Sequence, residues 1–266
     1  MIKILDALCE AGGARNEDLI RYDEKNVLVL DGSTGLRADA PDACWFTENF
    51  ADAFMGLIRR TDDLCASVEQ ALEEVRRQFF RECRDPCADG VFPSASAVIA
   101  HQSGDLLQIL NVGDCTTVLF EKEKTSLLYS EEVDRFDGAV IAELQKERQR
   151  TRLDIADLVK TDRIRGMLLE NRKKMNAPDG YEILAFNMPK RTPSHLLQID
   201  RAQLRQVVML TDGFRPCLEA LKTLPCPSLR SLYESLRQTE REDPGMNQRP
   251  RFKISDDASA IVFEVQ

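Results

Sequence analysis

The chain has 266 residues, of which 43% are hydrophobic and 30% charged, and its formal net charge is −9. This composition, with no biased tract, is typical of a globular protein of one large domain or two small ones, and we favour a single domain over residues 1–266. The acidic balance argues against a nucleic-acid-binding surface, and no stretch approaches the ~18 apolar residues of a membrane span.

Cysteine usage and the N-terminus bear on the compartment. The apolar run at the start of the chain is too short for a signal peptide, so we expect a cytoplasmic protein without a membrane partner. Eight cysteines are present but no Cys-x-x-Cys pair, and there are only two histidines. This pattern favours reduced thiols over disulfides or a zinc site. The oligomeric state is not indicated.

The first elements are strands. An apolar run over residues 2–7 leads into a loop, and residues 20–22 are positioned to pair with 27–30 through a turn at 23–26. This hairpin would bring Glu17 and Asp18 beside Asp31. The second strand runs directly into Asp31-Gly32, and an acidic turn at a strand end leaves space for a metal ion or a phosphate.

Helices and then further strands follow. Apolar residues recur at helical spacing over 45–58 and again over 64–79, which predicts two core-facing helices layered on a sheet. From residue 94 to 130 the period becomes that of short strands with turns between them. Consecutive short strands of this kind predict an antiparallel meander.

The second half alternates in the same way. Residues from about 133 to 176 are highly charged, and because acidic and basic residues interleave we expect a solvated pair of amphipathic helices rather than a nucleic-acid arm. A second set of strands is expected between 181 and 210, followed by helices and a loop rich in Pro and Gly before the last strand. The pattern is α+β, with two antiparallel sheets and helices outside.

Acidic residues recur at strand ends. The apolar run 207–210 leads into Thr211-Asp212-Gly213, and Asp256 and Asp257 directly precede the final strand. These positions, together with Asp31, could meet at one edge of a sheet. Clustered carboxylates of this kind need cations to hold them together.

Six short motifs occur in order along nearly the whole chain. They are Arg15-Asn16-Glu17-Asp18, Asp31-Gly32, Ser94-Ala95-Ser96-Ala97-Val98, Asn111-Val112-Gly113-Asp114-Cys115, Thr211-Asp212-Gly213 and Asp256-Asp257-Ala258-Ser259. In this order they resemble the metal-dependent PPM, or type-2C, protein serine/threonine phosphatases, in a form more like bacterial than eukaryotic members.

The resemblance implies an α-β-β-α arrangement, a central β-sandwich flanked by helices, with two Mn²⁺ or Mg²⁺ ions in a cleft at one end. Asp31 would bridge the two metals and Gly32 would offer its carbonyl to the second. Asp212 and Asp256 would complete the first. Glu17 and Asp18 would act through metal-bound waters. Carboxylate oxygens are suitable ligands for such hard cations.

The implied reaction is hydrolysis of a phosphomonoester, with a phosphoserine or phosphothreonine protein as the expected partner. A water bridging the two metals would attack phosphorus in line, without a phosphoenzyme. Arg15 is the candidate that would hold the phosphate oxygens through its planar guanidinium group.

The motifs also depart from the family pattern. Ser33 and Thr34 stand where many members have a His and a Gly. Asp114 matches a ligand of a third metal found in some members, but Pro216 stands where another of its ligands is expected. This argues against a third metal site.

Two other interpretations are open. A haloacid-dehalogenase-like phosphatase also begins with an apolar strand leading to Asp, but its general acid would fall on Ser33, which cannot serve. A phosphatase-like binding module with weak or no activity is the second. Retention of the main acidic positions favours catalysis, because clustered carboxylates without compensation destabilise a fold. His101 and His195 match no motif and are expected to be structural.

Overall fold

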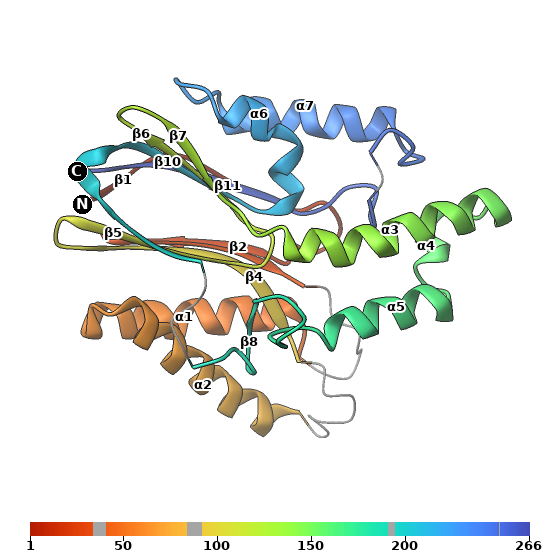
Figure 1. Ribbon diagram of the computed structural model, residues 1–266, viewed down its shortest axis with the longest axis horizontal. Helices are drawn as coiled ribbons and strands as arrows, with labels where there is room; N and C mark the ends of the chain where they lie inside the picture. Colours follow the sequence, from red (N-terminus) through yellow and green to blue (C-terminus); the bar gives the residue numbers. More distant parts are fainter. Residues whose placement is uncertain (34–40, 84–91, 191–194, 250) are drawn as a thin grey trace.

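Two antiparallel β-sheets form the centre of the computed structural model, which describes residues 1–33, 41–83, 92–190, 195–249 and 251–266 (Figure 1). The first sheet has the order β1 (Ile2–Glu10), β11 (Ala258–Val265), β10 (Leu204–Leu210), β6 (Thr116–Glu121) and β7 (Thr125–Leu128). The second has the order β2 (Asp18–Tyr22), β3 (Asn26–Gly32), β4 (Ser94–Ser103), β5 (Leu106–Val112) and β9 (Leu196–Asp200), and β8 (Leu184–Ala185) pairs with β4.

The sheets pack face to face as the predicted sandwich. Val29, Ile109 and Met209 are among the fully buried residues of the core between them. Every pairing between the named strands is antiparallel. The α+β prediction is therefore confirmed. The haloacid-dehalogenase-like interpretation is wrong, because that fold depends on a Rossmann-like segment with parallel strands.

Helices cover both outer faces (Figure 1). The second sheet is covered by α1 (Ala43–Thr61) and α2 (Leu64–Glu82), with Phe46, Phe50 and Phe54 of α1 fully buried at a spacing of four residues. Asp42 and Asp63 cap these helices through bonds from the Trp45 and Ala66 amides. The first sheet is covered by α6 (Leu218–Leu221) and α7 (Leu229–Glu242), which follow the 3₁₀ helix Asp212–Cys217.

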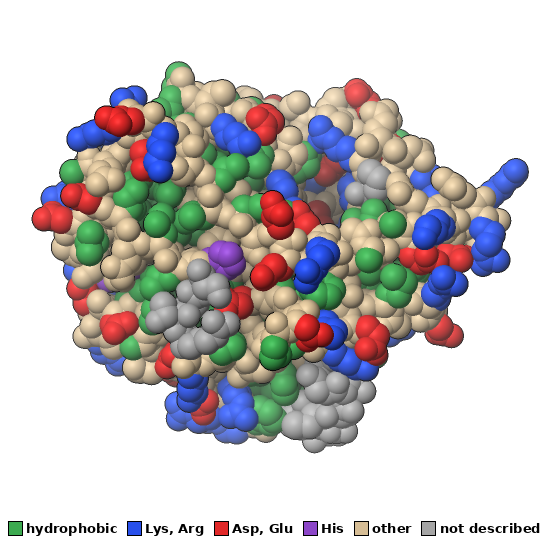
Figure 2. All heavy atoms as spheres, in the orientation of Figure 1, with side chains coloured by type: hydrophobic (Ala, Val, Ile, Leu, Met, Phe, Trp, Pro, Cys, Tyr) green, Lys and Arg blue, Asp and Glu red, His purple; other side chains and the backbone are tan. Residues whose placement is uncertain are grey.

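The charged segment forms a projecting end at one side of the sandwich (Figure 1). It contains α3 (Glu132–Thr151), α4 (Ile155–Leu158) and α5 (Asp162–Arg172). These helices share a small apolar core with Met246 and Phe252 from the loop before β11. Acidic and basic side chains are mixed over this end (Figure 2). The predicted pair of amphipathic helices is confirmed, with the short α4 added between them.

The strands do not form the two meanders that the sequence predicts. β4 and β5 pair in the second sheet, but the chain then crosses to the first sheet for β6 and β7. β9 lies on β5, whereas β10 lies between β6 and β11. The prediction is wrong because β4 is buried on both faces, so alternation of polar and apolar residues does not show which sheet a neighbouring strand joins.

The crossing has a defined geometry. Gly113, with φ +77°, lies against Ser96, where an added Cβ would overlap the Ser96 side chain. The Asn111 side chain donates to the Cys115 carbonyl at 3.0 Å and accepts from the Thr117 hydroxyl at 3.3 Å. Asp114 is thereby held in the turn between the two sheets.

The acidic strand ends gather at the projecting end of the sandwich. In the β2–β3 hairpin Asp18 lies opposite Asp31, as predicted. β10 and β11 pair so that Leu210 lies opposite Ala260, which sets Asp212 near Asp256 and Asp257. The two termini lie together at the other end of the sandwich (Figure 1).

Two further predictions concern cysteines and membranes. The seven cysteines within the described residues are all unpaired, whereas Cys87 lies outside those residues. Across the described ranges, no helix combines the length and the apolar character that a membrane crossing requires.

Candidate active site

A cavity of about 280 Å³ lies between the sandwich and the α3–α5 end, where the surface is hollowed in Figure 2. Its wall brings together four acidic residues of the sequence motifs, Asp31, Asp114, Asp212 and Asp256, each from a different strand end or turn. The other lining residues are Gly32, Ser33, Ser96, Val133, Asp137, Val159, Leu168, Asn171, Arg172, Tyr181, Ile183, Phe252 and Lys253.

The carboxyl groups of Asp31 and Asp212 both have strongly raised pKa values. Burial raises the pKa of Asp31 well above its usual range, and the charges of Asp212 and Asp18 raise it further. Burial raises the pKa of Asp212 in the same direction, with Asp114 and Asp256 as the next causes. Like charges in a desolvated site favour protonation or the binding of a cation.

Glu17 and Asp18 lie behind the cavity wall, next to the residues they were predicted to support. The Gly32 amide donates to the Glu17 carbonyl at 3.1 Å. The buried Asp18 carboxylate accepts from the Thr211 hydroxyl at 2.8 Å. Burial raises the pKa of Asp18 to about 7, although that hydroxyl bond opposes the shift. Their action through metal-bound waters stays a prediction.

Asp257 fixes the relative position of two turns. Its carboxylate accepts from the Gly12 amide at 2.8 Å and from the Glu17 amide at 2.7 Å. Asp257 belongs to one of the sequence motifs, but the sequence alone predicted no role for it. It joins the start of β11 to the loop before β2, and so places Asp256 relative to the β2–β3 hairpin.

Asp114 is held by a cation from the neighbouring turn. Arg215 donates to the Asp114 carbonyl at 2.6 Å and to the Asp134 carboxylate at 2.7 Å. Its guanidinium lies 4.8 Å from the centre of the Tyr129 ring and 4.0 Å from the Asp114 carboxylate. A protein cation therefore stands beside the residue that resembles a third-metal ligand, and the expectation of no third metal stays a prediction.

The structure does not place Arg15 in the wall of the cavity. Its side chain is exposed and pairs with Asp42, the N-cap of α1. The proposed phosphate-binding role of Arg15 therefore has no support from its position.

Three cavity residues were missed by sequence reasoning: Asp137, Arg172 and Lys253. Arg172 donates to the Ser94 hydroxyl at 3.1 Å, and burial lowers its pKa, although an arginine remains charged at neutral pH. Burial raises the pKa of Asp137 to about 7, with Asp114 as the second cause. Lys253 lies 2.7 Å from the Asp256 carboxylate. None lies in a motif, and a basic residue in the last turn of a helix, as Arg172 is in α5, is too common to mark a site.

The donor set suits a hard divalent cation. The carboxylates and the backbone at Gly32 supply the oxygen ligands that Mg²⁺ and Mn²⁺ take. Burial and mutual repulsion at Asp31 and Asp212 would be relieved by positive charge. As the side chains stand, however, no three His, Cys, Asp or Glu residues in the described part of the chain are grouped closely enough to hold a metal ion.

Gly213 allows the Asp212 turn to approach the start of β11. A Cβ at this position would overlap the Asp257 carbonyl oxygen. We expect Gly213→Ala to lower the free energy of unfolding by about 3 kcal/mol, because backbone must move to admit the methyl group. Gly56→Ala is the control, since nothing surrounds that exposed helical position and alanine favours helix there.

Urea unfolding followed by circular dichroism measures both variants. If the Gly213 and Gly56 variants had the same stability, the close approach of the Asp212 turn would not constrain the fold.

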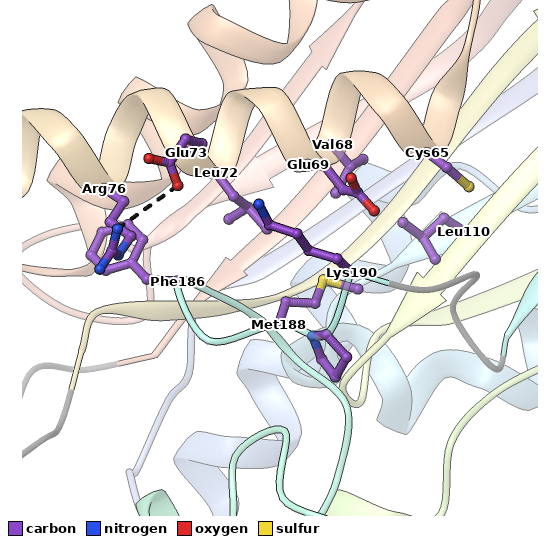
Figure 3. Close-up of a pocket in the computed structure, with 11 residues that line it drawn as sticks. Cys65, Val68, Glu69, Leu72, Glu73, Arg76, Leu110, Phe186, Met188 and Lys190 are labelled. Atoms are coloured by element: carbon purple, nitrogen blue, oxygen red, sulfur yellow. Dashed lines mark ion pairs between the residues drawn. The ribbon is translucent and has the colours of Figure 1, made fainter.

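A second cavity, of about 40 Å³, lies between α2 and the segment 186–190 (Figure 3). Val68, Leu72 and Phe186 supply apolar walls, and Arg76 pairs with Glu73 at 3.8 Å. Its volume is far below the several hundred Å³ of a typical small-molecule site. We interpret it as a packing gap beneath the helix layer.

His101 lies away from the carboxylate cavity. It is 1% exposed, and its Nδ1 lies 2.8 Å from the Asn26 side-chain oxygen. Asn26 and His101 are opposite each other across β3 and β4. The expectation that His101 is structural agrees with this position.

The fold is that of the bacterial PPM serine/threonine phosphatases. The serine/threonine phosphatase PstP/Ppp of Mycobacterium tuberculosis matches 100% of this chain and 99% of its own, with a TM-score of 0.56 and 15% identity. The PPM Ser-Thr phosphatase MsPP from Mycobacterium smegmatis, solved with cacodylate, matches 99% of each chain with a TM-score of 0.55 and 12% identity.

The catalytic domain of PstP, solved with two manganese ions, matches 99% of this chain and 97% of its own, with a TM-score of 0.53 and 14% identity. No family model matches the sequence, and neither does any curated protein. The likeness therefore lies in the fold, which the ordered motifs anticipated.

Proposed function

We propose that this protein is a metal-dependent phosphomonoester hydrolase that acts on phosphoserine and phosphothreonine in proteins. The observation that carries the proposal is the convergence of Asp31, Asp114, Asp212 and Asp256 on one cavity beside Arg172. Carboxylates suit divalent cations and a guanidinium suits phosphate oxygens. The manganese ions of the structurally similar PstP domain support the choice of metal.

The residues would divide the work as follows. When bound, two Mn²⁺ or Mg²⁺ ions would supply Lewis acidity and an acidified water. Asp31, Asp212, Asp256 and the Gly32 carbonyl would be their ligands. Asp257 and Asp18 would keep the acidic turns in position through their bonds to backbone and hydroxyl groups.

Arg172 would orient the phosphate group. It lines the cavity, whereas Arg15 pairs with Asp42 outside it. A guanidinium can form two parallel hydrogen bonds to phosphate oxygens, and burial strengthens such bonds. The Ser94 contact fixes the approach of the Arg172 side chain from α5.

Hydrolysis of 4-nitrophenyl phosphate and of a phosphothreonine peptide tests the proposal. We expect purified protein to release product when Mn²⁺ is added, to stop when EDTA is added, and to recover when excess Mn²⁺ is restored. If Mn²⁺ caused no product release from either substrate, the proposed enzymatic activity would be rejected.

A phosphatase-like binding module is the second candidate. It is favoured by the absence of a preformed three-residue metal group in the described residues and by the Lys253–Asp256 contact. In that case the protein would bind a phosphopeptide without releasing phosphate, which calorimetry and a phosphate assay on one sample distinguish.

A further inference from the structure

A lysine side chain is paired with one of the acidic residues of the cavity. Lys253 Nζ lies 2.7 Å from Asp256 Oδ1, and both residues line the cavity. The lysine precedes the aspartate by three residues in the loop before β11. Such a charge-assisted contact takes up a carboxylate oxygen that could otherwise bind a metal ion.

The backbone around this pair is firmly held. Arg237 donates to the Asp256 carbonyl at 2.6 Å and pairs with Glu240 at 2.7 Å, and Glu240 accepts from the Ser255 hydroxyl at 2.7 Å. Earlier in the loop, Asp243 accepts from three successive backbone amides. The backbone at Asp256 is therefore held by contacts that do not involve Lys253.

The lysine side chain, in contrast, has room to leave. It is 45% exposed, and among the described residues it forms an ion pair with Asp256. Lysine has a long flexible stem and a compact charge, so it can turn to solvent without unfolding the loop. The Lys253–Asp256 pair can open while the backbone that carries it stays in place.

We propose that Lys253 competes with a divalent metal ion for Asp256, so that two metal ions bind in order and with unequal affinity. The inference rests on the proposed metal-dependent function. The ion held by Asp31 and the Gly32 carbonyl would bind first, because its ligands do not include Asp256. The ion held by Asp31, Asp212 and Asp256 would have to displace Lys253, so its site would fill only when free metal is abundant.

Titration of the metal-free protein with Mn²⁺ by calorimetry tests the competition. Wild type is expected to show one tighter and one weaker binding step. Lys253→Met keeps the apolar stem but removes the charge, and should tighten the weaker step about tenfold, because a unit charge a few ångströms away opposes a divalent ion even at the dielectric of water. Lys253→Arg should keep the weaker step.

Lys124→Met is the matched control, since Lys124 is 68% exposed and pairs with Glu121 in the β6–β7 turn. It should leave both steps unchanged. Thermal unfolding without metal confirms that each variant is folded, and Lys253→Gln replaces Lys253→Met if the latter is not.

The outcomes separate the two claims. If the weaker step had the same affinity in wild type and in Lys253→Met, the competition would be overturned but metal binding would stand. Absence of Mn²⁺ binding in both proteins would overturn the proposed metal centre together with the competition.

Discussion

Replacing Asp31 by Asn is expected to lower the Mn²⁺-dependent kcat/KM for 4-nitrophenyl phosphate by at least about 10³-fold, or ~4 kcal/mol of transition-state stabilisation. Asp31 ends β3 within the cavity, and the charges of Asp212, Asp18, Asp114 and Asp256 all act on it. Its loss would leave the proposed pair of ions without a shared ligand. Steady-state kinetics over a range of Mn²⁺ concentrations measure the effect.

The same variant should be more stable than wild type when metal is absent. Burial and neighbouring carboxylates raise the pKa of Asp31 in the folded state. The unfolded chain therefore releases this proton at a lower pH than the folded chain, and Asp31 lowers stability at every pH above the unfolded-state value of about 4. Asparagine removes that cost. The difference in melting temperature should therefore grow as pH rises from about 4 through the folded-state pKa.

Asp105→Asn serves as the control, because Asp105 is 81% exposed in the turn between β4 and β5. It should change neither activity nor metal-free stability by a large amount. Asp31→Asn could instead lose activity and also be less stable than wild type in the absence of metal. Asp31 would then be a structural residue and not a metal ligand.

Replacing Arg172 by Ala is expected to lower kcat/KM about 10²-fold, mainly through KM. A desolvated guanidinium contributes charge-assisted hydrogen bonds to phosphate, each worth about 1.5–3 kcal/mol. Inorganic phosphate should inhibit the variant correspondingly more weakly. Arg172→Lys should be intermediate, because lysine keeps the charge but not the planar pair of donors.

Two controls distinguish phosphate binding from a structural effect. Ser94→Ala removes the hydroxyl that Arg172 contacts at 3.1 Å, and should cost much less than Arg172→Ala. Arg15→Ala should change kcat/KM by less than about twofold, because Arg15 is exposed and pairs with Asp42. A larger loss from Arg15→Ala than from Arg172→Ala would restore the assignment made from the motif.

Local sequence was sufficient to predict the structure where residues that are close in the chain are also close in space. The register that sets Asp18 opposite Asp31 follows from a four-residue turn between two apolar runs. The helices α1 and α2 follow from apolar spacing and from the N-caps Asp42 and Asp63. The acidic cluster was also predictable, because strand ends tend to meet at the edge of a sheet.

Strand order was not predictable in the same way. β4 is buried along nearly its whole length, so its residues carry no alternation to distinguish the face toward the other sheet from the face toward the helices. The crossing after β5 depends on Gly113 lying against Ser96, a contact that requires both strands to be in place. Local patterns cannot encode such a condition.

The three charged cavity residues that the sequence did not predict were missed for a similar reason. Arg172 and Asp137 come from helices whose mixed charge indicates a solvated surface, and only their position at the end of the sandwich turns them toward the carboxylates. Lys253 lies in an irregular loop. A charged residue gains a role in a site when the fold encloses it, and composition gives no sign of enclosure.

The position of β11 sets when this cavity can form during synthesis. β11 lies between β1 and β10, so residues Ile2–Glu10 find their sheet partner only after Ala258–Val265 have been made. Pairing over so long a separation in sequence carries a large loop-closure cost and slows folding. Asp256 enters with the same strand. A growing chain therefore carries an incomplete set of carboxylates, and β1 waits as an exposed edge strand open to pairing with other chains.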